Sequence, residues 1–497
     1  MRNMVTRRFF LLSGSALIGT GGAWANAPVT SLRPQARREG VRISTADGLK
    51  SILRGAGLPG EVACAVADVK SGLRLEAENG TAGLPPASVA KALTALYALD
   101  ILGADHRFQT RVIATGSIIG GVLKGDLILV GGGDPTLNTD HLAQLAKTLK
   151  TAGVREVRGG FKLWDGALPY VRTIDADQPD HVGYSPAISG LALNYNRVHF
   201  EWKRAGQSWS VSMDARTEKY RPEVSVARMK VAKRKAPVYT YADRGGADQW
   251  TVANAALGKG GSRWLPVRRP TEYAGDVFRT MARAHGIVLS KPKVVNSLPQ
   301  GKVLAQHSSA TLSVMLRGML KYSNNLMAEM IGMSASAAGG RRPGSLKASA
   351  DAMNRWAAAK YGMSSTRLVD HSGLGEASRM TPNDLVGALI AARKVGQLKP
   401  LLKPFLLRDA SGKVNKNHPI KVSAKTGTLN FVSGLGGFMT AADGTELAFA
   451  IFAADQRARS RIKRADRERP QGARGWNRKA KKMQQKLIER WGSVYGS

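Results

Sequence analysis

Three short motifs follow one another along the chain, and each brings side chains that can act on an acyl group. They are Ser88-Val89-Ala90-Lys91, Ser323-Asn324-Asn325 and Lys425-Thr426-Gly427-Thr428. A serine hydroxyl becomes a nucleophile when a base removes its proton, and a desolvated lysine near a second cation can be that base. The residue types therefore indicate acyl transfer through an ester on a serine.

The first motif depends on a helix for its geometry. Ser88 and Lys91 are three residues apart, so at the start of a helix they share one face. The sequence predicts this helix over residues 88–102, where apolar residues recur near helical spacing without Gly or Pro. A second match to the pattern, Ser290-Lys291-Pro292-Lys293, contains a proline and precedes no helical run, so we interpret it as a chance match.

The second motif lies between two predicted helices, residues 312–320 and 325–335. A loop at such a junction can present Ser323 and Asn325 to a cleft. By itself, however, the motif also fits a simple helix cap made by Ser323, because caps favour serine and asparagine.

The third motif occurs once in the chain and is the most specific of the three. On an edge strand, Lys425 can hold a carboxylate, and Gly427 leaves room for a peptide to lie along the strand. The alternative for this motif is a plain turn at Thr426-Gly427. The order of the three motifs and their predicted surroundings favour one common site.

The elements that must position these motifs fall into three blocks. Strand patterns over residues 61–69 and 73–77 precede the helix at 88–102. The middle block has short β-like runs and basic loops, at residues 112–114, 127–130, 208–213 and 228–235. The last block predicts more helices and strands, at residues 312–320, 325–335, 347–361, 381–395, 421–425, 434–440, 446–453 and 479–491. We therefore expect one α/β (α+β) domain, residues 28–104 and 296–497, split by a β-rich insertion, residues 105–295.

Charge and cysteine content narrow the class of protein. The net charge of +38, from 74 basic and 36 acidic residues, predicts attraction to polyanions such as nucleic acid or an anionic cell envelope. The single cysteine, Cys64, excludes an intramolecular disulfide and a cysteine-based metal site, and its apolar neighbours predict burial. The eight histidines show no metal-ligand spacing, so we expect no metal and no cofactor.

The first 27 residues indicate export. Arg7-Arg8 precedes a short apolar stretch, and residues 23–27 offer two A-x-A cleavage sites. The arginine pair is similar to a twin-arginine signal, and a general secretory signal is the alternative. No later segment approaches 18 uninterrupted apolar residues, so we expect a soluble periplasmic protein without a transmembrane anchor. Export, and the lack of an aromatic-basic platform, weigh against nucleic acid as the partner.

At its three motifs the chain resembles the penicillin-binding proteins, in particular the D-alanyl-D-alanine carboxypeptidase/endopeptidase branch, the peptidase S13 family. Residues 125–137 and Asp370-His371-Ser372-Gly373-Leu374 are similar to further segments of that family, although His371 replaces a glycine. Because lone histidines are often partly buried, we expect His371 to pack, with contact to the cleft as the alternative. The long interval between Lys91 and Ser323 fits the family's insertion, whereas β-lactamases place these motifs closer together. The resemblance implies a serine β-lactamase/transpeptidase-like domain, in which an antiparallel sheet is flanked by helices.

The resemblance also implies a catalytic role for each motif. Ser88 would attack the carbonyl between two D-alanines of peptidoglycan peptides, and Lys91 would be the base, with its proton affinity lowered by Lys425. Ser323 would relay the proton to the leaving D-alanine. The backbone N–H groups of Ser88 and Thr428 would form the oxyanion hole. A β-lactam would acylate Ser88 and stall there.

The remaining motif residues are implied to bind substrate. Asn325 would bind the substrate's amide, while Lys425, Thr426 and Thr428 would receive its terminal carboxylate. Gly427 would let the peptide lie along the strand. Asn324, where aspartate is common in the family, would point away from substrate.

Other functions remain open at this stage. A β-lactamase needs a deacylating base, for which the sequence offers no convincing carboxylate. A D-amino-acid esterase of the same fold, or a non-catalytic cell-wall-binding protein, is also compatible with the motifs. The basic tail, residues 457–486, has 13 Lys/Arg and two acidic residues. It fits either a solvated surface or adhesion to anionic envelope polymers.

Overall fold

The computed structural model describes residues 47–340, 342–409 and 411–496, and these belong to one compact unit. The predicted export signal at residues 1–27 lies outside the described residues. No helix in the described ranges is long and apolar enough to cross a membrane.

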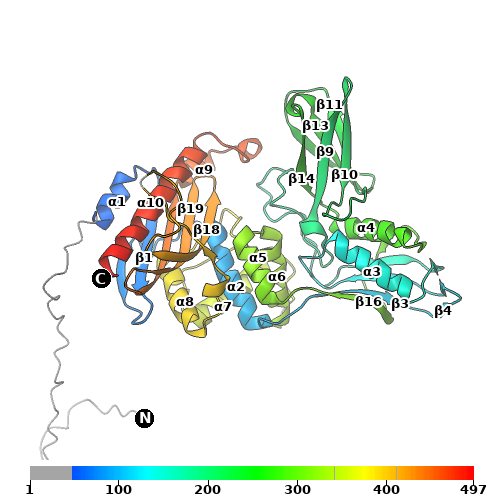
Figure 1. Ribbon diagram of the computed structural model, residues 1–497, viewed down its shortest axis with the longest axis horizontal. Helices are drawn as coiled ribbons and strands as arrows, with labels where there is room; N and C mark the ends of the chain where they lie inside the picture. Colours follow the sequence, from blue (N-terminus) through cyan, green and yellow to red (C-terminus); the bar gives the residue numbers. More distant parts are fainter. Residues whose placement is uncertain (1–46, 341, 410, 497) are drawn as a thin grey trace, which may run out of the picture. The chain divides into compact units, whose positions relative to one another are not determined.

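A six-stranded antiparallel sheet joins the two ends of the chain (Figure 1). Its strand order is β17-β18-β19-β20-β1-β2, so β20 from the C-terminal part pairs with β1 from the N-terminal part along the whole of β1. The strands are β1 (Glu61–Asp68), β2 (Arg74–Glu78), β17 (Lys403–Pro404), β18 (Lys421–Leu429), β19 (Val432–Thr440) and β20 (Glu446–Ala454). The predicted α/β domain with a flanked antiparallel sheet is confirmed.

Helices cover both faces of this sheet. Cys64 and Val66 of β1 point to one face, where they pack with α10 (Ala473–Val494), and α1 (Leu49–Gly55) lies beside α10. Ala65 and Ala67 point to the other face. That face packs on α8 (Pro382–Val395). The same hydrophobic core continues into the helices α2 (Ala90–Leu102), α5 (Leu312–Tyr322), α6 (Asn325–Ala338) and α7 (Leu346–Tyr361). Because both faces are buried, β1 is apolar from Val62 to Ala67 instead of alternating with polar residues.

Burial also decides the role of Cys64. Its side chain is fully buried and no other cysteine exists to pair with it. Burial raises the pKa of the thiol to about 12, so it stays protonated and unreactive. The predicted packing role is confirmed.

The inserted segment contains more helix than the sequence indicated. A mixed five-stranded sheet has the order β15-β8-β6-β3-β16, and α3 (Thr139–Thr151) and α4 (Pro270–Ala284) pack together over it. Its strands are β3 (Gln109–Ala114), β6 (Leu127–Gly131), β8 (Phe161–Trp164), β15 (Lys293–Val294) and β16 (Lys302–Ser308). Because β16 pairs with β3, this sheet reaches beyond the boundary at residue 295 that the sequence suggested.

The rest of the insertion is made of small sheets. One has the order β10-β9-β14, from Ser208–Asp214, Arg197–Ala205 and Gly260–Pro266, and the next has the order β11-β13-β12, from Ala227–Ala232, Ala247–Ala253 and Tyr239–Arg244. A third joins β4 (Ile118–Ile119), β5 (Val122–Leu123) and β7 (Glu156–Val157). The prediction of a basic loop at 228–235 is wrong for β11. There Met229 is buried while Arg228 and Lys230 point outward, an alternation that the charged residues conceal.

Two predicted elements prove longer than expected. Strand β18 extends through the third motif, with Gly427 paired to Gly434 of β19, so the alternative of a turn at Thr426-Gly427 is wrong. Helix α10 begins at Ala473, six residues before the predicted start, because its first turns are too basic to show an apolar stripe.

Trp491 should be a principal contact between α10 and the sheet. Its side chain is fully buried beside Phe449, and its Nε1 donates to Glu76 at 2.9 Å. We expect Trp491→Ala to lower the free energy of unfolding by about 3–5 kcal/mol, measured by urea denaturation. The exposed Lys479→Ala change on the same helix should stay within about 0.5 kcal/mol, and an equal effect of both changes would contradict this packing argument.

Candidate active site

The first motif begins where a 3-10 turn becomes a helix. Ser88 lies in the turn η1 (Ala87–Val89), which continues directly into α2, so the helix predicted from residue 88 is present with a tighter first turn. Lys91 follows on the same side, and its Nζ lies 3.0 Å from Ser88 Oγ. The side chain of Lys91 is fully buried, which places its amine away from bulk water.

The amine of Lys91 joins three segments of the chain. Besides Ser88 Oγ, it contacts Asn325 Oδ1 at 2.7 Å and the backbone oxygen of Ser372 at 2.8 Å. Burial lowers the pKa of Lys91 to about 8, against the opposing charges of Glu329 and Asp370. The resemblance implied Lys425 as the cause of this shift, whereas the structure gives burial as the leading cause.

Two buried carboxylates hold the segment behind Lys91; sequence reasoning missed Glu329 and gave Asp370 no role. Glu329 accepts hydrogen bonds from the backbone N–H groups of His371 and Ser372, both at 2.9 Å. Asp370 accepts those of Gly373 and Gly375 at 2.6 Å. Burial raises the pKa of both carboxyl groups. These contacts aim the Ser372 carbonyl at Lys91, so Glu329 and Asp370 are positioning residues.

Gly373 allows this segment to approach the turn that carries Ser88. Its φ is +74°, in the left-handed region, and a Cβ on it would collide with the backbone oxygen of Ala87. The neighbouring His371 is fully buried, with Nε2 2.7 Å from Ser349 Oγ, and Gly332 leaves the space for its ring. The expectation that His371 packs is confirmed.

The second motif separates α5 from α6. Ser323 ends α5 with a left-handed φ of 56°, and the side chain of Asn324 caps α6 by accepting the Met327 N–H at 3.0 Å. The alternative of a cap by Ser323 is therefore wrong, because Asn324 makes it. Ser323 Oγ instead accepts a hydrogen bond from Lys425 Nζ at 3.0 Å, and Asn325 Nδ2 donates to the backbone of Tyr184 at 2.9 Å.

The third motif places a second buried lysine opposite the first. Lys425 is 2% exposed, and burial, followed by the charge of Lys91, lowers its pKa to about 7. Strand β17 covers β18 only at Ser423 and Ala424. Within the described residues, the edge of β18 from Lys425 onward has no paired strand, so a peptide could add to it.

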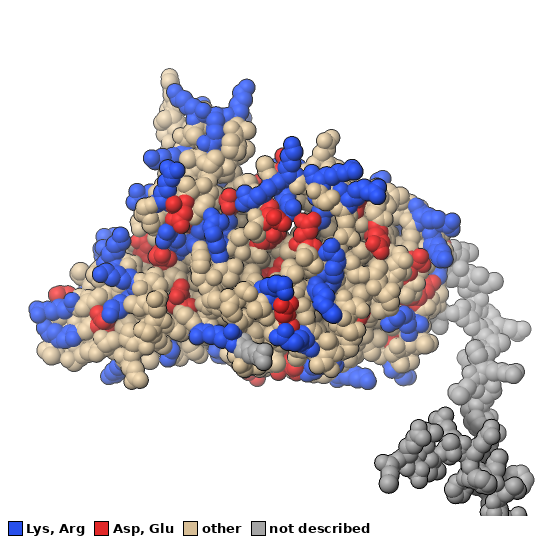
Figure 2. Space-filling model, turned by 180° about the vertical axis from the view of Figure 1, so that it is seen from behind, with Lys and Arg blue, Asp and Glu red and all other residues tan. Residues whose placement is uncertain are grey.

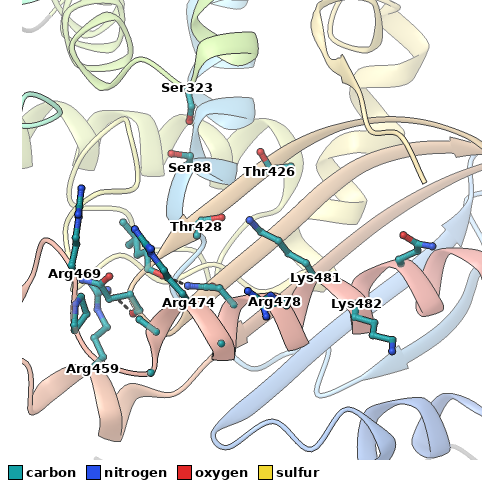
Figure 3. A pocket seen from close by; sticks show the side chains of 18 of the residues that line it. Ser88, Ser323, Thr426, Thr428, Arg459, Arg469, Arg474, Arg478, Lys481 and Lys482 are labelled. Carbon is teal, nitrogen blue, oxygen red and sulfur yellow. Dashed lines mark hydrogen bonds between the residues drawn. The ribbon is translucent and has the colours of Figure 1, made fainter. Parts of the chain in front are cut away.

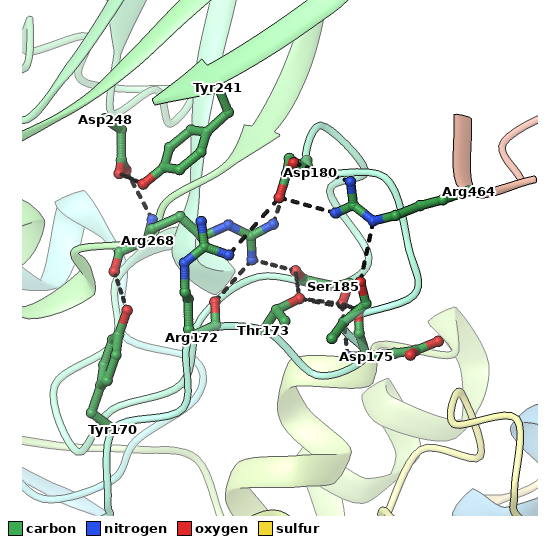
Figure 4. Close-up of polar contacts among 11 residues, drawn as sticks. Tyr170, Arg172, Thr173, Asp175, Asp180, Ser185, Tyr241, Asp248, Arg268 and Arg464 are labelled. Carbon is green, nitrogen blue, oxygen red and sulfur yellow. Dashed lines mark hydrogen bonds and ion pairs between the residues drawn. The ribbon is translucent and has the colours of Figure 1, made fainter. Parts of the chain in front are cut away.

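The insertion supplies one wall of the site through the loop that carries Tyr184. Arg268 holds this loop, since its guanidinium donates to the backbone oxygens of Arg172, Asp180 and Ser185 at 2.7–3.0 Å (Figure 4). The Asp180 carboxylate lies 3.2 Å from the guanidinium of Arg464, which comes from the C-terminal segment. Sequence reasoning missed Tyr184 and Arg268 because no local pattern marks them.

These walls line an open cleft with a cavity volume of about 1920 Å³ (Figure 3). From the motifs it is lined by Ser88, Ser323, Asn325, Thr426 and Thr428. The Lys91 amine donates hydrogen bonds to Ser88 and Asn325, and the Lys425 amine donates one to Ser323. Gly427 packs on the nucleophile turn, where a Cβ would lie 2.6 Å from the Pro86 oxygen and 3.0 Å from Ser88 N. All eight residues singled out from the sequence therefore lie in or against one cleft.

A possible metal cluster lies elsewhere, in the insertion. Ligand atoms of His199, Glu201 and Asp214 lie within 4.8 Å of one another, a grouping that the spacing of the histidines did not reveal. However, Arg216 reaches both carboxylates, with contacts of 2.8 Å to Glu201 and 2.9 Å to Asp214. A guanidinium already neutralises these acids, so we assign no cation to this cluster.

Comparison with known sequences gives a consistent family. The family model described as D-Ala-D-Ala carboxypeptidase 3 (S13) matches residues 46–469. A D-alanyl-D-alanine carboxypeptidase of Actinomadura sp. (strain R39) is 29% identical over 447 residues, covering 82% of this chain and 80% of the relative. The D-alanyl-D-alanine carboxypeptidase DacB of Haemophilus influenzae is 26% identical over 399 residues, covering 75% and 81%.

Comparison with solved structures gives the same fold. The crystal structure of penicillin-binding protein 4 from Haemophilus influenzae matches with a TM-score of 0.69 at 22% identity, covering 82% of this chain and 93% of that one. That protein has also been solved in complex with a β-lactam, and this second structure matches with a TM-score of 0.66.

Gly427 offers a test of the approach between β18 and the nucleophile turn. Gly427→Ala should push the strand and the turn apart by a few tenths of an ångström or more, because the added Cβ meets backbone atoms. We expect acylation by benzylpenicillin to slow by about 100-fold, as measured by mass spectrometry of the protein. Gly387→Ala is the matched control, since a Cβ there meets nothing within 4 Å. Unchanged acylation of the folded Gly427 variant would contradict the close approach.

The two buried lysines predict a bell-shaped pH dependence. If Lys91 is the base, it must be neutral, so acylation should rise with pH up to its pKa of about 8. If Lys425 holds a substrate carboxylate, it must be charged, so acylation by a carboxylate-bearing donor should fall above its pKa of about 7. We expect the optimum of kcat/KM for benzylpenicillin between these values. A thioester donor without a carboxylate should show the rising limb alone, and a falling limb for both donors would exclude this assignment of Lys425.

Proposed function

The chain belongs to the peptidase S13 family of D-Ala-D-Ala carboxypeptidases, and on that premise we propose that Ser88 carries the acyl group through its reaction. The protein is a serine-type carboxypeptidase hydrolase that acts on peptidoglycan. The observation that carries the assignment of Ser88 is the amine of Lys91, which touches both Ser88 Oγ and Asn325 Oδ1. Ser290, the serine of the chance match to the same pattern, has no lysine amine as a hydrogen-bond partner among the described residues. Its hydroxyl accepts the Phe161 N–H at 3.0 Å.

Acylation begins with a proton transfer. Neutral Lys91 takes the proton of Ser88, whose oxygen then attacks the carbonyl carbon of the penultimate D-alanine. The negative charge that develops on the carbonyl oxygen is held by the backbone N–H groups of Ser88 and Thr428. Support for this oxyanion hole comes from the contact of Gly427 with Ser88, which brings β18 to the start of the helix.

The leaving group is the terminal D-alanine. The peptide C–N bond breaks, and the proton that Lys91 took from Ser88 passes to the departing amine with Ser323 as the relay, so that Lys91 becomes neutral again. A hydrogen bond from Lys425 holds Ser323 in place. Charged Lys425, with Thr426 and Thr428, holds the terminal carboxylate, while Asn325 binds the amide of the substrate chain. Water then attacks the ester on Ser88, which releases the shortened peptide and restores the hydroxyl.

β-Lactams are the proposed covalent inhibitors of this site. Their ring amide presents the same carbonyl to Ser88, and their carboxylate suits the same lysine. The β-lactam complex of the Haemophilus influenzae protein with this fold supports this proposal. Cleavage of cross-linked peptides, an endopeptidase activity, uses the same chemistry with a larger leaving group. The cavity of about 1920 Å³, much larger than a dipeptide, favours it as a second activity.

A β-lactamase is less well supported than a carboxypeptidase. Rapid deacylation needs a carboxylate that can activate water beside Ser88. The carboxylates beside Lys91, those of Glu329 and Asp370, are fully buried, and their oxygens already accept backbone N–H groups. A D-amino-acid esterase would use the same acyl-enzyme, and a non-catalytic scaffold would not need the contact between Lys91 and Ser88.

We further propose that the protein is exported by the twin-arginine route and works in the periplasm. The support is the sequence of residues 1–27, with Arg7-Arg8 ahead of an apolar stretch and two A-x-A sites. Anionic envelope polymers remain proposed partners on account of the net charge of +38.

Labelling with a fluorescent penicillin tests the role of Ser88. The wild-type protein should form a covalent adduct and release D-alanine from a short D-Ala-D-Ala peptide, and Ser88→Ala should abolish both. Ser290→Ala should label as the wild type does, because that serine lies in the insertion. If Ser88→Ala still forms the adduct, or the wild type forms none, the assignment fails.

A further inference from the structure

The wall of the active-site cavity formed by the C-terminal segment is strongly cationic. This basic wall consists of exposed side chains that line the same cavity as Ser88: Arg469, Arg474, Arg478, Lys481, Lys482 and Lys486. Figure 3 shows Arg474 and Lys481 directed from α10 toward the side of the cavity where Thr426 and Thr428 lie, while Lys482 points away. The catalytic motifs and the basic wall therefore face a common space.

The charges of the basic wall are not neutralised by the protein. Deeper in the cavity, Arg459 lies 3.7 Å and Arg467 lies 3.2 Å from the carboxylate of Glu376. In contrast, Arg474, Arg478 and Lys481 form no ion pair with any carboxylate in the part of the chain that the structure describes. Their charge is thus available to a ligand in the cavity.

The arrangement of these cations is unfavourable for the helix itself. Arg478 lies four residues after Arg474 and three before Lys481, so like charges are neighbours on the helix surface. The first turn of α10 contains no acidic residue, although acidic residues are favoured there. A ligand with several negative charges would relieve this repulsion.

The position of the basic wall selects the ligand. A separate polyanion bound here would occupy the cavity of Ser88 and exclude the substrate. General attraction to an anionic envelope needs no such wall, because Figure 2 shows Lys and Arg side chains scattered across the face that it displays. The occupant that is compatible with catalysis is the substrate polymer itself. Peptidoglycan peptides are polycarboxylates, since each ends in a carboxylate and carries further acidic groups.

We propose that Arg474, Arg478 and Lys481 form an extended subsite for the carboxylates of cross-linked peptidoglycan. This subsite makes the enzyme prefer the polymer to short D-Ala-D-Ala peptides. The inference rests on the proposed function of Ser88 and adds to it a substrate class. The subsite holds the peptidoglycan polymer beside the scissile bond, so it raises the local concentration of substrate without touching the reacting atoms.

A charge-removal experiment with a matched control tests this subsite. The test variant combines Arg474→Gln, Arg478→Gln and Lys481→Gln. The control combines Arg457→Gln, Lys463→Gln and Lys479→Gln, at exposed residues that do not line the cavity. Each variant removes three positive charges from a net charge of +38, so long-range attraction changes equally in both.

The readout is the rate of product release from purified cross-linked sacculi, divided by kcat/KM for a short N-acylated D-Ala-D-Ala peptide. At about 50 mM salt we expect this ratio to fall about tenfold in the test variant and to stay within about twofold in the control. At about 0.5 M salt the difference should largely disappear, because exposed charges are then screened.

Other outcomes would overturn the inference. An unchanged ratio in the test variant, or an equal fall in the control, would show that the basic wall has no role in substrate selection. Binding to phosphatidylglycerol vesicles that only the test variant loses, with the ratio unchanged, would assign the wall to a lipid surface. If the wild type neither labels with penicillin nor cleaves the short peptide, the proposed role of Ser88 is wrong. These two assays therefore distinguish a failure of the proposed function from a failure of the subsite.

Discussion

The buried amine of Lys91 is the contact on which the rest of the site depends. A lysine that is fully buried needs partners for its protons, and here they come from Ser88, Asn325 and the Ser372 carbonyl. These partners lie on segments far apart in sequence, so the fold must bring three segments to one nitrogen. The same burial lowers the pKa of Lys91 to about 8, which makes it able to act as a base.

The surrounding architecture can be understood as support for that contact. Glu329 and Asp370 fix the segment that carries the Ser372 carbonyl, and their charge keeps the pKa of Lys91 from falling further. On the other side, β18 brings Lys425 to Ser323, and Gly427 removes the side chain that would hold the strand away from Ser88. The insertion contributes Tyr184 through a loop that Arg268 holds by three backbone oxygens.

Basic side chains outnumber acidic ones along the cleft. Burial lowers the pKa of Lys425 to about 7, and the basic wall of α10 adds exposed cations to the same cavity. Such a field attracts anionic substrates and orients a terminal carboxylate toward Lys425.

The sequence by itself determined the motifs and their order. It also determined that two separate segments form one α/β domain with an insertion between them, because these features are local patterns of residue type and periodicity. It also led to all eight proposed site residues and to the buried state of Cys64 and His371. It did not reveal α3 and α4, the strand β11 or the roles of Glu329, Asp370 and Tyr184. Those depend on which surfaces meet after folding. Only the tertiary structure decided that burial is the cause that lowers the pKa of Lys91, and that the basic tail faces the cavity of Ser88. Desolvation and proximity arise from contacts between distant segments.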